Sequence, residues 1–170
     1  HQIKYAASTG IPPVDRGMLM VYNMGHPKYT TVTNSIFDYD LVKSYTQTLA
    51  TYPLPLDRAF PLFSWAVLYK QGKYKRLIRN IDDTAIKANT HFKKTGKHRY
   101  RAVEACSIGD ASLERGDELR IDKVDDKELV RACNLLNKRL YCSGSTMSIF
   151  SFANITGDYG RAHKLFKSIQ

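Results

Sequence analysis

The sequence predicts an α/β fold in which parallel strands alternate with helices. Three segments, residues 18–24, 57–68 and 145–152, are apolar along most of their length and have polar boundaries, as strands buried on both faces do. Helical patterns separate these segments, which is the order of βα units. Polar and aromatic residues occur at the ends of the strands, among them Tyr22, Asn23, Trp65 and Asp158. In βα folds, binding sites lie at these strand ends.

The first strand and the first helix lie in the N-terminal third. Residues 1–7 are expected to be extended, and the strand at 18–24 (MLMVYNM) is closed by Gly25 and Pro27. Either Asn34 or Ser35 is expected to cap a helix that runs to about residue 51. Its apolar stripe consists of Ile36, Leu41, Val42, Tyr45 and Leu49.

A β-rich segment follows the second strand. That strand covers residues 57–68 and contains Pro61, where we expect an irregularity. Gln71 and Gly72 predict a hairpin turn between residues 65–70 and 73–79. The polar stretch 80–96 is expected to hold one short helix. Further strands are expected at 100–106 and at 118–124, the latter half-exposed because it alternates polar and apolar residues.

The C-terminal part completes the α/β pattern. Asp125 and Asp126 are expected to start a helix that ends near Leu140, and its acidic start and basic end suit the helix dipole. The third buried strand is expected at 145–152, and a final helix at 161–169.

Composition indicates one globular domain. The chain has 170 residues, of which 43% are hydrophobic, and this excludes a collagen, a coiled coil and a wholly disordered chain. The longest apolar run, 59–68, is far shorter than the roughly 20 residues of a transmembrane helix, so no transmembrane segment is predicted. No signal peptide is visible. The chain starts at His1, which leads us to expect a longer natural protein.

The positive charge is concentrated in one segment. Residues 69–101 contain eleven Lys or Arg and two Asp, so they carry +9 of the formal net charge of +10. Tyr69, Tyr74, Phe92 and Tyr100 are interspersed among these cations. One interpretation is a binding module for a polyanion, such as nucleic acid, an acidic polysaccharide or an anionic membrane surface. The alternative is a solvated Lys-rich face, because no nucleic-acid motif accompanies the charge.

The sequence offers no cofactor or metal motif. Cys106, Cys133 and Cys142 form no C-x-x-C pair and the five His are scattered, so no metal site is predicted. Free thiols, or one disulfide if the protein is exported, both remain open. The G-x-S-x-G, G-x-G-x-x-G and P-loop patterns are absent, so no nucleotide or other cofactor is expected.

Three blocks resemble family-18 (chitinase-type) glycoside hydrolases. Residues 18–25 (MLMVYNMG) resemble the sixth barrel strand of that family, which typically reads Met-x-Tyr-Asp. Residues 56–67 (LDRAFPLFSWAV) resemble the seventh strand, and residues 145–158 (STMSIFSFANITGD) resemble the eighth. The same blocks are also similar to a group of uncharacterised, exported bacterial (β/α)-barrel proteins, in which they lie in the C-terminal half of a longer chain.

This resemblance implies the C-terminal half of a TIM-like (β/α) barrel. The chain is expected to form one partial barrel domain, residues 1–170, with a small basic α+β insertion at about 69–124 between the last two strands. It departs from the family at two positions. Asn23 replaces the family Asp, and Phe150 and Phe152 stand where the eighth strand usually ends in Trp. The family's catalytic Glu motif on the fourth strand has no match, so enzymatic activity of this chain is left undecided.

The resemblance implies a carbohydrate-active protein that supplies part of a sugar-binding cleft. Tyr22, Asn23, Trp65 and Asp158 are the expected ligand contacts. Asp15 and Asp57 precede their strands and are expected to form ion pairs or caps with the adjacent Arg. The expected partners are a glycan and either a second copy or the missing N-terminal half, because half a barrel exposes its sheet edges. The resemblance also implies export to the periplasm, cell surface or medium.

Overall fold

The computed structural model describes residues 3–79, 81, 83–140, 144–150 and 155–169, with the side chains of 155–159 outside the description. The chain forms two compact units. The first unit comprises His1–Met24, Asp38–Leu62 and Val124–Gln170, and the second comprises Gly25–Phe37 and Phe63–Lys123.

A parallel sheet lies at the centre of the first unit. Its strands are β1 (Gly17–Met20), β2 (Leu56–Pro61) and β10 (Met147–Phe150), in the order β1-β2-β10. Both pairings are parallel, with Met20 opposite Ala59 and Phe150 opposite Pro61. The predicted parallel α/β architecture is therefore confirmed for these strands. The described residues form no closed barrel.

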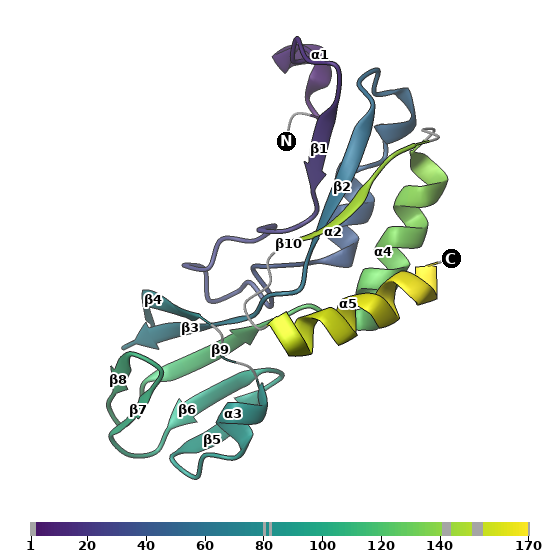
Figure 1. The fold of residues 1–170 in the computed structure, drawn as a ribbon. Helices are drawn as coiled ribbons and strands as arrows, with labels where there is room; N and C mark the ends of the chain where they lie inside the picture. Colours follow the sequence, from purple (N-terminus) through teal and green to yellow (C-terminus); the bar gives the residue numbers. More distant parts are fainter. Residues whose placement is uncertain (1–2, 80, 82, 141–143, 151–154, 170) are drawn as a thin grey trace. The chain divides into compact units, whose positions relative to one another are not determined.

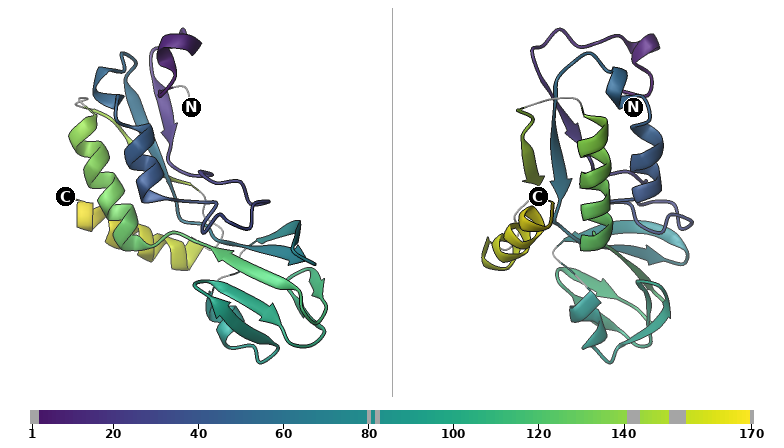
Figure 2. Two further views of the ribbon diagram at one scale, coloured as in Figure 1. Left: turned by 180° about the vertical axis from the view of Figure 1, so that it is seen from behind. Right: turned by 90° about the vertical axis from the view of Figure 1, so that its right-hand side faces the viewer.

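Helices cover one face of this sheet. Figures 1 and 2 show α2 (Tyr39–Tyr45) and α4 (Asp126–Arg139) side by side on one face of the three strands. The side chains that fill the space between are almost fully buried, among them Val21, Val42, Phe60, Leu129 and Leu136. The unit also contains the short helices α1 (Ala6–Thr9) and η1 (Leu49–Thr51), and α5 (Ile155–Ile169), which contacts α4.

The predicted start of α4 is confirmed. The Asp125 carboxylate accepts hydrogen bonds from the backbone N–H groups of Lys127 (2.9 Å) and Glu128 (3.3 Å), which have no partner within the helix. Lys138 and Arg139 lie in the last turn, where the helix dipole favours cations.

The first helix was predicted too long. It begins at Tyr39, with Asp38 as its cap, and ends at Tyr45. The sequence had predicted a cap at Asn34 or Ser35 and an end near residue 51. Asn34 instead closes a turn, since its Oδ1 accepts from the backbone N–H of Ile36 at 3.0 Å. Ser35 donates its backbone N–H to Asp122 of the second unit's sheet. These two residues therefore serve the second unit and not the helix.

Other predicted elements of the first unit also need correction. Residues 6 and 7 belong to the helical turn α1, whereas the whole stretch 1–7 was expected to be extended. The strand predicted at 18–24 ends at Met20, and it is not buried on both faces, because Met18 and Met20 are 49% and 61% exposed. The strand predicted at 145–152 is described only up to Phe150, and its residues are half-buried or exposed.

The second unit is built on an antiparallel sheet of order β4-β3-β9-β6-β5. The strands are β3 (Trp65–Lys70), β4 (Lys73–Arg79), β5 (Phe92–Gly96), β6 (Arg99–Ala102) and β9 (Glu118–Asp122). The helix α3 (Asp83–Lys87) and the hairpin of β7 (Cys106–Ile108) and β8 (Ala111–Leu113) complete the unit. The predicted hairpin turn is confirmed. Gln71 and Gly72 join β3 to β4 with positive φ angles of 51° and 73°, as a tight two-residue hairpin loop requires.

Two strand predictions fail in this part of the chain. The single strand predicted at 57–68 is two strands of different sheets, since β2 ends at Pro61 and β3 begins at Trp65. Proline has no N–H to donate, which suits the end of a strand. The strand predicted at 118–124 corresponds to β9, which was expected to be half-exposed. Instead, every residue of β9 except Glu118 is buried. Its Leu119 and Ile121 belong to the apolar core of the unit, and its Arg120 contacts backbone oxygens of residues 29 and 32.

Candidate functional site

An aromatic pair marks the carboxyl end of the parallel sheet. Tyr22 follows β1 after one intervening residue, and Phe150 is the last residue of β10. Their rings are stacked, with centroids 5.0 Å apart and planes 7° from parallel. Phe150 is 49% exposed, so the pair presents apolar ring surface to solvent. Parallel strands end at the same edge of their sheet, and this brings together two residues that are 128 positions apart.

Asn23, three residues beyond the end of β1, has an unusual backbone conformation. Its φ is +55°, in the left-handed region that Asn tolerates better than most residues, and the residue is exposed. The chain therefore turns immediately after Tyr22. Tyr22 and Asn23 therefore lie just beyond the carboxyl end of β1, and their role in binding stays a prediction.

The other two predicted site residues lie elsewhere or outside the description. Trp65 starts β3 in the second unit, and its Nε1–H is shared between Ser35 Oγ and Asp122 Oδ2, both at 3.3 Å. Its half-buried ring lies against Phe63 with centroids 5.1 Å apart. Its N–H is thus engaged inside the unit, while part of the ring remains accessible. Asp158 lies within α5, and its side chain is outside the described residues.

Asp57 is structural. It lies near the amino end of β2, where its Oδ1 pairs with Arg16 at 2.9 Å and accepts from the backbone N–H of Thr146 at 2.6 Å. The hydrogen bond from Thr146, aided by Arg16, holds the pKa of Asp57 below its ordinary value. The carboxylate is therefore ionised and already bound by these two partners. The expected ion pair exists, but with Arg16 in place of the adjacent Arg58. Arg58 bonds to Asn137 on α4 and to Ser145.

The second unit contains a buried carboxylate that sequence reasoning missed. Asp83, 3% exposed, accepts from His98 Nδ1 at 2.6 Å, Lys123 Nζ at 3.0 Å and Tyr100 OH at 3.2 Å. Burial by itself raises the pKa of Asp83, but the hydrogen bond from Lys123 and the charges of His98 and Lys123 outweigh it, and the pKa lies below its ordinary value. Burial and the Asp83 charge raise the pKa of Tyr100 to about 12, so this phenol remains a donor. No local sequence pattern joins these four residues.

A buried ion pair lies on β9 of the same unit. Arg120 and Asp122 are both 0% exposed, and Arg120 donates through Nε to Asp122 Oδ1 at 2.6 Å and through Nη2 to Oδ2 at 2.9 Å. Arg120 Nη1 donates to the backbone oxygens of Tyr29 (3.0 Å) and Val32 (2.7 Å). The pair thereby fastens residues 25–37 to the sheet. Its spacing of two residues along a strand, with opposite charges on one face, was the available signal.

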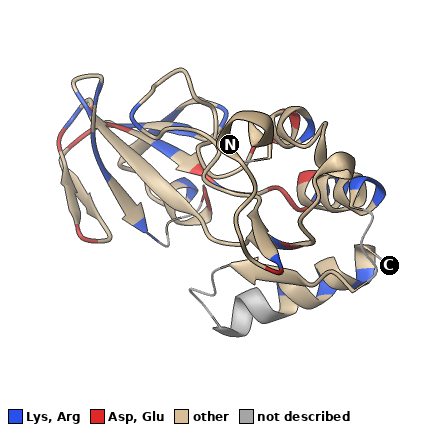
Figure 3. Cartoon of the chain, turned by 90° about the horizontal axis from the view of Figure 1, so that it is seen from above, with Lys and Arg blue, Asp and Glu red and all other residues tan. Residues whose placement is uncertain are grey.

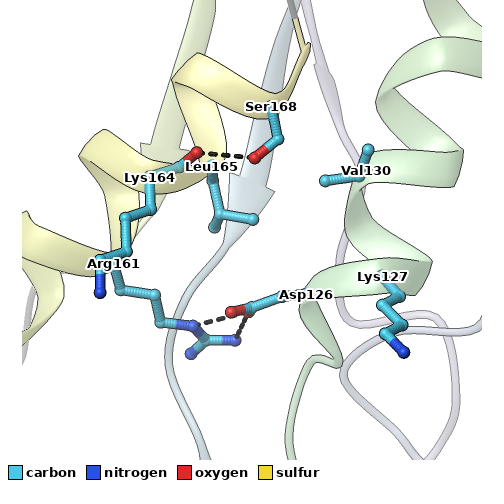
Figure 4. Close-up of a pocket in the computed structure, with 7 residues that line it drawn as sticks. All are labelled: Asp126, Lys127, Val130, Arg161, Lys164, Leu165 and Ser168. Carbon is cyan, nitrogen blue, oxygen red and sulfur yellow. Dashed lines mark hydrogen bonds and ion pairs between the residues drawn. The ribbon is translucent and has the colours of Figure 1, made fainter.

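A groove lies between α4 and α5 in the first unit. It has a cavity volume of about 410 Å³. Arg161 crosses it to pair with Asp126, with Nε–Oδ1 at 2.7 Å (Figure 4). Its Nη2 also donates to Val124 O at 2.8 Å. The guanidinium is therefore already occupied, and the apolar lining is limited to the side chains of Val130 and Leu165 and the stems of the longer residues. The groove is lined by Asp126, Lys127, Val130, Arg161, Lys164, Leu165 and Ser168.

Across the described residues, His, Cys, Asp and Glu form no group of three suited to a metal ion.

The basic segment is partly neutralised in the structure. Lys70 pairs with Asp117 at 3.1 Å, Arg101 pairs with Glu118 at 2.6 Å, and Arg76 pairs with Asp110. The exposed cations that make no ion pair with another described residue include Lys73 and Lys75 on β4 and Lys93 and Lys94 on β5. Because β4 and β5 are the outer strands of the sheet, these lysines line its two opposite edges; Lys and Arg are blue in Figure 3.

Comparison with known proteins supports the fold. A chitinase from Chromobacterium violaceum ATCC 12472 is similar in structure, with a TM-score of 0.50 and 12% sequence identity over 82% of this chain. The matched region is 41% of the chitinase, so the chain spans about two-fifths of that protein. No protein-family model and no curated protein matches the sequence. The expected glycoside-hydrolase-like fold is thus supported at this level of similarity.

No helix in the described ranges has both the length and the apolar character needed to cross a membrane.

Proposed function

We propose that this chain provides part of a glycan-binding surface on a glycoside-hydrolase-like fold, and that the stacked rings of Tyr22 and Phe150 form its platform. The single observation that carries the proposal is the position of this pair at the carboxyl edge of a parallel sheet. That edge is where βα folds place their ligands. An exposed aromatic surface with a phenol at one side suits a sugar, because the ring face is apolar and the hydroxyl can form hydrogen bonds.

The fold comparison supports the class of ligand. The similar structure is a chitinase, and we therefore propose a chitin-type oligosaccharide, whose N-acetylglucosamine rings have an apolar face and amide groups. Asn23, next to Tyr22 and exposed, is proposed to contact the polar substituents of the sugar. Trp65 and Asp158 are proposed as further contacts. Hydrolysis is not part of the proposal, since fold similarity alone does not supply a catalytic acid.

We extend the proposal to organisation and location. Residues 1–170 are proposed to be one partial barrel domain in which the basic α+β segment at about 69–124 is an insertion. An extracytoplasmic location is proposed, since polymeric glycans of this type lie outside the cytoplasm.

The test is titration of the chain with a soluble chitin tetrasaccharide by isothermal calorimetry. Tyr22→Ala and Phe150→Ala are each expected to weaken binding at least tenfold, because either change removes half of the platform. Tyr29→Ala is the matched control, since Tyr29 is also an exposed tyrosine, at 62%, but lies in the second unit. Equal affinity of all four proteins, or no binding by the unmodified chain, would refute the proposal.

A second candidate function rests on the unneutralised edge lysines. We propose as the alternative that β4 and β5 bind an acidic polysaccharide through Lys73, Lys75, Lys93 and Lys94. Heparin is the probe, and its affinity is expected to fall steeply between 50 and 200 mM salt, as in polyanion binding generally (~10-fold or more). The double variant Lys93→Ala/Lys94→Ala should reduce the salt dependence, whereas Lys127→Ala, an exposed lysine on α4, should not. A salt-independent affinity would reject this function.

A further inference from the structure

The contact between α4 and α5 in the first unit leaves a groove. The side chains of α5 that line it are Arg161, Lys164, Leu165 and Ser168, at positions i, i+3, i+4 and i+7, so they share one face of the helix. Helices that pack only for stability place an apolar stripe in such a contact, whereas Leu165 is the one apolar residue of this set. The groove has a cavity volume of about 410 Å³, within the range of about 300–1,000 Å³ that is typical of small-molecule sites.

Arg161 and Ser168 form the frame of the groove. The Arg161 guanidinium pairs with Asp126 at the start of α4, with Nε–Oδ1 at 2.7 Å, and its Nη2 donates to Val124 O at 2.8 Å. Ser168 Oγ donates to the backbone oxygen of Lys164 at 2.7 Å, so this hydroxyl is engaged within its own helix (Figure 4). Both side chains therefore hold the walls of the groove and are already occupied.

Lys127 and Lys164 give the groove a surplus of positive charge. Lys127 lies on α4 and Lys164 on α5, so they flank the groove from opposite walls, and both are exposed. Neither forms an ion pair with another described residue, whereas Asp126, the acidic residue of the lining, already pairs with Arg161. With Arg161 included, the lining holds three cations against one carboxylate. This charge favours an anionic ligand.

Apolar side chains lie between the two lysine-bearing walls. Val130 of α4 and Leu165 of α5 point toward each other across the groove (Figure 4). Val130 is half-buried, and Leu165, 4% exposed, forms the floor. A hydrocarbon chain placed here would be removed from water, whereas a polymer that is charged along its whole length would not use this surface.

We propose that this groove binds a small amphipathic carboxylate, with its hydrocarbon chain between Val130 and Leu165 and its carboxylate against Lys127 or Lys164. The surplus of cations selects an anion, the apolar pair selects a hydrocarbon chain, and the cavity volume selects a small molecule. The proposal uses neither the aromatic platform nor the edge lysines of the second unit, so it is independent of both functions proposed above.

The test is titration of the chain with octanoate, followed by calorimetry and by NMR of the ¹⁵N-labelled chain. Octanoate should bind at one site and shift the amide signals of Val130 and Leu165. Propionate has the same charge but a shorter chain, and 1-octanol has as many carbons but no charge. Each should bind at least about tenfold more weakly, because each retains only one of the two kinds of contact.

Charge-reversal variants localise the site. Lys127→Glu/Lys164→Glu should weaken octanoate binding at least about tenfold, because two carboxylates would then face that of the ligand. The matched control is Lys138→Glu/Lys167→Glu, which changes one exposed lysine on each of the same helices, outside the lining, and alters the net charge equally. Val130→Phe is the second variant, since the larger ring should fill the groove and abolish binding while both groove lysines remain.

Three results would overturn the proposal: no binding of octanoate, equal affinity for octanoate and 1-octanol, or equal effects of the two double variants. If circular dichroism shows that the Lys127→Glu/Lys164→Glu variant has lost its fold, Val130→Phe decides. An octanoate affinity unchanged by Val130→Phe would then overturn the proposal, and its loss would support it.

Discussion

Replacing Asp122 by Asn should destabilise the second unit more than any conservative surface change. The carboxylate is fully buried, and it accepts from Arg120, from the backbone N–H and hydroxyl of Ser35, and from Trp65. The substitution keeps the shape of the side chain but removes its charge. It also replaces one acceptor oxygen by an NH₂ group that must face these donors.

The magnitude follows from burial. Removing one partner of a buried ion pair leaves the other charge uncompensated and costs about 3–5 kcal/mol. Arg120 retains only the backbone oxygens of Tyr29 and Val32 as full acceptors. Because whole domains are stable by about 5–15 kcal/mol, the expected loss is about a fifth or more of the total.

The assay is urea unfolding followed by tryptophan fluorescence. Trp65 is the single Trp of the chain, and its indole N–H lies 3.3 Å from Asp122, so it reports directly on this cluster. Glu118→Gln is the matched control. Glu118 forms an ion pair with Arg101, and their side chains are 35% and 54% exposed, respectively. Ion pairs with this exposure contribute about 0–1 kcal/mol to stability.

A loss below about 1 kcal/mol for Asp122→Asn, or one no larger than that for Glu118→Gln, would refute the reasoning. Either result would mean that Arg120 finds other compensation once Asp122 is neutral.

Three further predictions concern single residues. The pKa of Asp83 is lowered in the folded chain. Its ionised carboxylate therefore stabilises the fold above the ordinary pKa of about 3.9, and this stabilisation is lost as the pH falls through the folded pKa. Asp83→Asn should make stability, measured by circular dichroism during unfolding, less dependent on pH in the acid range. Burial raises the pKa of Cys133 to about 12, so this thiol should resist iodoacetamide at pH 8 until urea unfolds the chain, as mass spectrometry would show. A Cβ on Gly25 would lie 2.8 Å from Val32 Cγ1, so Gly25→Ala should lower the free energy of unfolding by about 1–3 kcal/mol through overpacking. A Cβ on Gly96 would have its nearest contact at 3.7 Å, so Gly96→Ala is the control and should leave the melting temperature almost unchanged.

Local patterns predicted several elements correctly because short-range forces determine them. The Asp125 cap and the apolar stripe of α4 act within a few residues of one another, and the helix forms where they predict it. The Gln71–Gly72 turn depends only on two backbone conformations. The parallel character of the central sheet followed from apolar strands that alternate with helices.

Local patterns failed where distant residues compete for the same group. Ser35 looks like a helix cap, yet its N–H bonds to Asp122, 87 positions away, and the helix begins at Tyr39. The run 57–68 reads as one strand, yet its two halves join different sheets. Apolar character alone does not say which partner a strand will have.

The candidate site shows the same division. The sequence by itself determined the residue types at the strand ends, with Tyr22 and Asn23 after the first strand, and a parallel α/β order that brings strand ends to one edge. Only the tertiary structure decided that Tyr22 stacks on Phe150, that the Trp65 N–H is engaged by Asp122, and that Met18 and Met20 face outward. The physical reason is that strand periodicity and capping act through the nearest few residues, whereas stacking, burial and ion pairing depend on which segments meet after the chain has folded.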